Sequence, residues 1–342
     1  MPIPLVIGAA AAAAGVYGAV KGVSGVVDQS SAKHINNNAR TSVEVANQEL
    51  DELRRMANET LEDYGQRKLR AFNGVVSDFI GTFQIIKNVD LKQSVELDKL
   101  NAGDFSNRTL PSLTQDYQAL KDAGLGLGAG IGGGAALAFG SYNGTMLLAT
   151  ASTGTAISSL NGVAATNATL AWLGGGSLAT GGYGMTGGVM VLGGIVAGPA
   201  LAIFGHVLGN KGEEALNTAN ANREQAKTIC EQASLMGGKL KAITEVTSFA
   251  NTTFSNVSSR LRHAISDMKN TVNREGKDFG NYTDQGKIAV FNAVKFAQLL
   301  KAMIDTPLLD KEGNLVLSTK KRVIDINDVA SGKKESLDSM SQ

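Results

Sequence analysis

The sequence has no Asp, Glu, Lys or Arg between positions 123 and 210, although these four residue types make up 18% of the whole chain. This charge-free block is also rich in glycine. A glycine inside a solvated helix costs roughly 1 kcal/mol relative to alanine. In a bilayer, by contrast, small residues let helices pack closely. The gap excludes an ordinary solvated surface and predicts a membrane-spanning or membrane-inserting block.

Other absences narrow the function. The single cysteine, Cys230, excludes an intramolecular disulfide framework. The three histidines are far apart and have no metal-ligand spacing, which argues against a zinc or catalytic-histidine site; they are His34, His206 and His263. A net charge of +1 without a long basic run argues against nucleic-acid binding. Five prolines and 5% aromatics favour helices over sheets.

One motif resembles a dinucleotide fingerprint. Gly128, Gly130 and Gly133 have the GxGxxG spacing, but a helical stretch precedes them and no β-α-β pattern surrounds them. We therefore expect no cofactor and no metal, and a protein that is not an enzyme.

The N-terminal third predicts two helices. Residues 1–27 form a Gly/Ala-rich apolar segment, and its first cation, Lys21, follows the apolar core instead of preceding it as in a secretory signal. A retained membrane-seeking helix is favoured, with a soluble Ala-rich helix and a cleaved signal as alternatives. Residues 28–88 predict a long amphipathic helix with a phase slip near Gly65. Residues 89–122 read as connector helices.

The charge-free block, residues 123–210, predicts two membrane spans at about 124–148 and 185–208. Residues 157–173 are either a third buried helix or a re-entrant tip. Glycines four residues apart form faces suited to close helix packing, Pro199 would kink the last span and Trp172 would lie at an interface. A glycine-rich core that never meets lipid is the alternative. The glycines are Gly124, Gly128, Gly132, Gly126, Gly130, Gly134, Gly184, Gly188, Gly194 and Gly198.

Residues 211–304 predict a long heptad-patterned helix followed by an amphipathic helix at 288–304 that Pro307 ends. We expect the heptad helix to pack antiparallel to helix 28–88, since the block between them would be a hairpin. Residues 305–342 predict a small β-hairpin turning at residues 312–314, a third strand at 323–326, and a disordered tail.

Several segments resemble a known family. The segments ATASTGTAI (149–157), ATNATLAWLGGGSLATGG (165–182), IIKNVD (85–90) and the opening 22 residues are similar to an uncharacterised bacterial family of glycine-rich, glycine-zipper-like membrane proteins. That resemblance implies a membrane location, with the bacterial inner membrane expected, and no catalytic residues. In layout the chain also resembles α-helical pore-forming toxins and apolipoprotein-L-like proteins, which is an analogy of architecture.

The expected fold is all-α: long antiparallel coiled-coil helices bracket a transmembrane hairpin, with a small C-terminal β-hairpin. The expected function is a membrane-inserting protein that forms homo-oligomers through its glycine faces and permeabilises or remodels a lipid bilayer. A soluble cytoplasmic form, in which the flanking helices shield the block, is compatible with this. The alternative is a constitutive membrane scaffold whose coiled coil recruits a partner protein.

Overall fold

The computed structural model describes residues 25–91, 105–122, 139–141, 212–310 and 313–334. By internal contacts the chain forms two compact units. The first comprises Met1–Glu44 and Ala202–Thr228, and the second comprises Val45–Leu201 and Ile229–Gln342. Two long helices, α1 (Gly25–Ala71) and α8 (Gly212–Glu275), contribute to both.

The described part of the first unit consists of the beginnings of α1 and α8. Its buried positions are small, which lets two helices approach closely; they include Ala32, Ala39, Val43, Ala219 and Ala226. Asn222 Nδ2 donates a hydrogen bond of 3.0 Å to Asn36 Oδ1. This polar pair fixes which residues of the two helices lie opposite one another.

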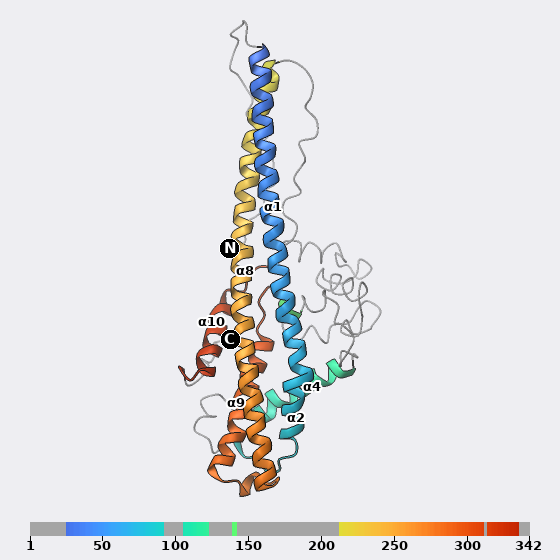
Figure 1. Cartoon of the computed structure of the whole chain (residues 1–342), viewed down its shortest axis with the longest axis vertical. Helices are drawn as coiled ribbons and strands as arrows, with labels where there is room; N and C mark the ends of the chain where they lie inside the picture. Colours follow the sequence, from blue (N-terminus) through green and yellow to red (C-terminus); the bar gives the residue numbers. More distant parts are fainter. Residues whose placement is uncertain (1–24, 92–104, 123–138, 142–211, 311–312, 335–342) are drawn as a thin grey trace. The chain divides into compact units, whose positions relative to one another are not determined.

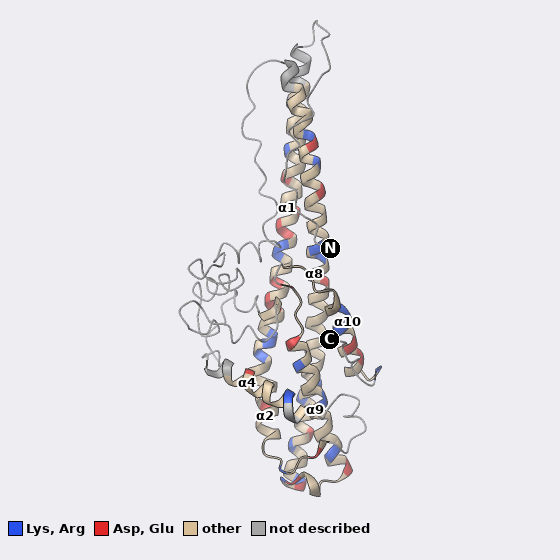
Figure 2. Cartoon of the chain, turned by 180° about the vertical axis from the view of Figure 1, so that it is seen from behind, with Lys and Arg blue, Asp and Glu red and all other residues tan. Residues whose placement is uncertain are grey.

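In the second unit α1 and α8 run parallel, side by side (Figure 1). Leu53 lies beside Gly237, Asp63 bonds Asn251, and farther along Asp78 faces Lys269. The residue numbers rise together along both helices. Charged residues of both signs are interspersed along both helices (Figure 2).

The expected antiparallel packing is therefore wrong. An apolar stripe with steps of three and four looks the same in either direction, so it carries no information on helix polarity. The expectation depended on a simple hairpin between the two helices. Instead, the chain between them contributes further described elements to the second unit, the π-helix η3 (Phe105–Thr109) and helix α4 (Leu110–Asp122).

The expected helix 28–88 is present as three consecutive pieces. Helix α1 passes into the π-helix η1 (Phe72–Val76), which continues into α2 (Ser77–Phe83). A π-turn inserts one extra residue and so rotates the apolar face. We expected the phase change near Gly65, but it lies at η1. Buried Lys68 continues the apolar stripe past Gly65.

The C-terminal part of the second unit is helical. A 3₁₀ turn, η7 (Phe279–Asn281), precedes α9 (Asp284–Asp305), whose N-terminus is capped by the Thr283 hydroxyl. Helix α10 (Leu317–Ala330) then packs on α9. The core of the second unit lies between α1, α2, α8 and α9; its largest buried side chains include Tyr64, Phe72, Phe79, Phe105, Phe254 and Leu261.

The expected C-terminal β-hairpin is wrong for the described residues. Among the described residues after α9 there is only an isolated antiparallel bridge between Leu309 and Leu315, with Gly313 at a φ of 76° between them. The expected third strand, 323–326, is helical within α10. Thr319, Val323, Ile326 and Ala330 are buried at helical spacing, and this period describes the segment better than alternation does.

No helix among the described residues combines the length and the apolar character needed to cross a bilayer. The two expected spans fall outside those residues, apart from positions 139–141 in the first span.

Candidate functional site

Three residues of the charge-free block are buried in the second unit. Phe139, Gly140 and Ser141 form a helical stretch, which we call the anchor segment. Phe139 is 2% exposed and Ser141 is fully buried. The residues that contact the segment, which we call the anchor site, come from α1, η1 and the chain after α9; they are Leu61, Gly65, Lys68, Phe72, Leu308 and Leu309.

Gly140 crosses α1 in backbone contact. A Cβ atom placed on Gly140 would lie 1.9 Å from the carbonyl oxygen of Leu61 and 3.0 Å from the amide nitrogen of Gly65. Both atoms belong to the backbone of a helix and have little freedom to move. Only glycine fits at position 140, and the crossing is the kind of close approach that small residues permit.

Ser141 is held through its main chain. Its carbonyl oxygen accepts hydrogen bonds of 2.9 Å from the amides of both Leu308 and Leu309. These amides follow Pro307, where α9 has ended, so no helical carbonyl is available to them. Buried amides need a partner, and the anchor segment supplies it.

Lys68 covers the other end of the anchor segment. Its side chain is fully buried, and Nζ lies 3.4 Å from the carbonyl oxygen of Phe139 and 3.5 Å from that of Ile304. The same nitrogen lies 4.4 Å from the ring centroid of Tyr64 and 5.6 Å from that of Phe139. Lys68 thus joins α1, α9 and the anchor segment through carbonyls and aromatic faces.

Burial lowers the pKa of Lys68 to about 7, because the charged amine loses its hydration, and the nearby carboxylate of Asp305 offsets only part of this loss. At neutral pH the group is therefore poised between its neutral and charged forms. Burial also raises the pKa of the adjacent Tyr64 phenol, which stays protonated and lies 3.4 Å from the Met303 carbonyl oxygen.

A second buried group of charges holds α4, the helix directly before the charge-free block. Lys301 Nζ on α9 lies 3.0 Å from Asp116 Oδ2 on α4 and 2.5 Å from Asp305 Oδ1 on its own helix. Burial raises the pKa of Asp116 against the opposing effect of Lys301. The pKa of Lys301 is raised despite its burial, through the charges and hydrogen bonds of Asp305 and Asp116. The ion pair fastens the entry to the block.

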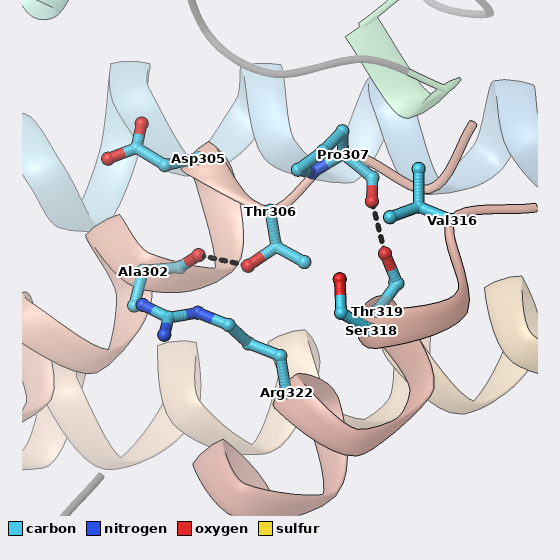
Figure 3. A pocket seen from close by; sticks show the side chains of 8 residues that line it. All are labelled: Ala302, Asp305, Thr306, Pro307, Val316, Ser318, Thr319 and Arg322. Carbon is cyan, nitrogen blue, oxygen red and sulfur yellow. Dashed lines mark hydrogen bonds between the residues drawn. The ribbon is translucent and has the colours of Figure 1, made fainter. Parts of the chain in front are cut away.

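A cavity of about 240 Å³ lies beside the anchor site, between the end of α9 and the start of α10 (Figure 3). Its two buried threonine hydroxyls are committed: Thr306 donates to the Ala302 carbonyl and Thr319 to the Pro307 carbonyl. Asp305 points away from Arg322 in this view. The cavity brings together no nucleophile with a base.

The arrangement suits holding a chain segment better than catalysis. Lys68, whose pKa is lowered to about 7, is fully buried and does not line the cavity. Within the described ranges, no cluster of three or more histidine, cysteine or acidic side chains could hold a metal ion. The contacts of the anchor segment are steric, main-chain and aromatic.

The site residues expected from the sequence all lie outside the described residues, so they stay a prediction. They are the ten glycines of the two faces, Trp172 and Pro199. Gly140, which we did not single out, is the glycine of the block whose close packing is described.

Two signals in the sequence point to the site in retrospect. Lys68 lies four residues from both Tyr64 and Phe72, on the apolar stripe of its helix. Lys301 likewise falls between Ala297 and Ile304 on the stripe of α9. A cation in phase with core positions indicates a buried polar contact.

Comparison of the chain with protein-family models, with curated proteins and with solved structures gives no match.

Proposed function

We propose that the chain is a non-enzymatic membrane-inserting protein that oligomerises through its glycine-rich block and permeabilises or remodels a bilayer. The observation that carries the proposal is the block itself, 88 residues without a charged side chain. Such a stretch is suited to a hydrocarbon environment and to glycine-mediated helix packing. The helical part of the chain would then be the water-facing carrier of the block.

The anchor segment supports this proposal. It belongs to the charge-free block, yet Phe139, Gly140 and Ser141 are buried against helices that carry charged residues of both signs. This is the arrangement expected of a form in which the helical unit shields part of an apolar block from water.

Liposomes test the proposal. Purified, detergent-free protein is added to dye-loaded vesicles, and dye release and flotation with lipid are measured on one sample. Release together with flotation is expected. Flotation without release would instead favour the membrane scaffold with a protein partner. If the protein shows neither flotation nor release, that result would contradict membrane insertion under these conditions.

Variants then test the glycine faces. Replacing both Gly128 and Gly132 by leucine should abolish release and the oligomer detected by cross-linking, since leucine prevents close helix approach. Gly81→Leu is a matched control, because Gly81 is outside the block and its Cβ direction is open. An unchanged oligomer in the Gly128/Gly132 variant would contradict assembly through that face.

A further inference from the structure

We propose that the anchor segment is a latch: its binding to the anchor site holds the charge-free block in a form that is not inserted, and its release permits insertion. The gating half of this inference rests on the proposed function. The docking half rests only on contacts within the second unit. Three independent contacts support the docking of the anchor segment, and each involves a different part of the second unit.

The steric contact gives the latch its specificity. Gly140 touches the backbone of α1 at Leu61 and Gly65, where a methyl group would have to displace helix main chain. The fit is therefore available to glycine and to no other residue. A single methyl group should weaken binding of the segment without altering any side chain of the anchor site.

The main-chain contact gives the latch a direct readout. The Leu308 and Leu309 amides both donate to the Ser141 carbonyl, which belongs to the anchor segment. When the segment leaves, both amides lose their acceptor. Their hydrogen exchange therefore reports the latch without any reference to membranes.

The aromatic contact makes the latch separable from the rest of the core. The Phe139 ring lies 6.2 Å from that of Phe72 and also faces Lys68. A different aromatic pair, Tyr64 with Phe254, joins α1 to α8 without the anchor segment. Loss of Phe139 should therefore open the latch while the α1–α8 pair stays folded.

Gly140→Ala in the full-length protein is the principal test, with Gly238→Ala as the matched control. Gly238 has nothing within 4 Å of its Cβ direction, so alanine is accommodated there. We expect exchange at Leu308 and Leu309 to rise about tenfold or more in Gly140→Ala and to stay unchanged in the control. Phe139→Ala should give the same local rise, and it serves as the test if Gly140→Ala does not fold.

The outcomes separate the two halves. Unchanged exchange at Leu308 and Leu309 overturns the latch, as does a rise of equal size along the whole of α8. If exchange rises locally and dye release from liposomes rises several-fold, both halves are supported. A local rise with wild-type release overturns the gating. If exchange rises locally and no form of the protein releases dye, the proposed function fails while the docked segment stands.

Discussion

The side-chain nitrogen of Lys68 lies 3.4 Å from the main-chain carbonyl oxygen of Phe139, and through this contact a fully buried lysine meets the charge-free block. Within the described residues no carboxylate forms an ion pair with Lys68; Asp305 acts on it at longer range. A buried lysine without a direct counter-ion destabilises the folded protein when it is charged.

Lys68 predicts a specific dependence of stability on pH. Its pKa is about 7 in the folded protein and 10.5 when unperturbed, so the unfolded chain binds more protons between these values. The free energy of unfolding should therefore rise with pH across this window, by up to about 1.4 kcal/mol per pH unit, and the contribution should be constant below pH 7. Urea denaturation of the wild type and Lys68→Met at pH 7, 8 and 9 measures it.

In Lys68→Met this contribution to the slope should be absent, so the difference in stability between the two proteins should change with pH. Lys241→Met, at an exposed position of α8, is the control and should follow the wild type. Parallel pH profiles for the wild type and Lys68→Met would contradict a neutral buried amine.

A second prediction is that mild acid does not open the latch. Below pH 7 Lys68 is largely protonated in both states and contributes no further change. Burial raises the pKa of Asp116, so the folded form gains that proton more readily and is favoured as the pH falls through this pKa. Lys301 and Asp305 are the charged groups facing it.

The measurement is the opening free energy at the Leu308 and Leu309 amides, obtained from hydrogen exchange at pH 7 and pH 5 after correction for intrinsic rates. Equal or greater protection at pH 5 is expected. Lower protection at pH 5 would show that a group other than Lys68 and Asp116 controls the segment.

The sequence predicts some of these features well and others not at all. The spacing of apolar residues in the sequence predicts α8, because Leu240, Phe254 and Leu261 recur at helical spacing and are buried as expected. The anchor segment gives no such signal. Gly140 lies among many glycines of similar context, and what distinguishes it is a steric fit to Leu61, some 80 residues away in sequence.

The polarity of the long helices was equally inaccessible to periodicity, and cross-linking tests the parallel arrangement. Leu53 Cδ1 lies 3.1 Å from the position of a Cβ on Gly237. In a Cys230→Ser background, Leu53→Cys with Gly237→Cys should therefore form an intramolecular disulfide on mild oxidation. Leu53→Cys with Gly238→Cys is the control and should cross-link poorly, because Gly238 has open space in its Cβ direction. Equal cross-linking of both pairs would contradict this register.

The buried charges that hold α4 give the last prediction. Lys301→Met should destabilise the protein by about 3 kcal/mol or more, because Asp116 then stays buried without its cation and close to Asp305. Asp116→Asn should cost only about 1 kcal/mol, since Lys301 keeps Asp305 as its partner. In the double variant, Asp116→Asn should recover part of the loss caused by Lys301→Met, which urea denaturation of all four proteins would measure as a coupling energy.

Additive losses of stability in the double variant would mean that the 3.0 Å pair of Lys301 and Asp116 does not hold α4. A coupling would mean that the buried pair of Lys301 and Asp116 holds the helix that leads into the charge-free block.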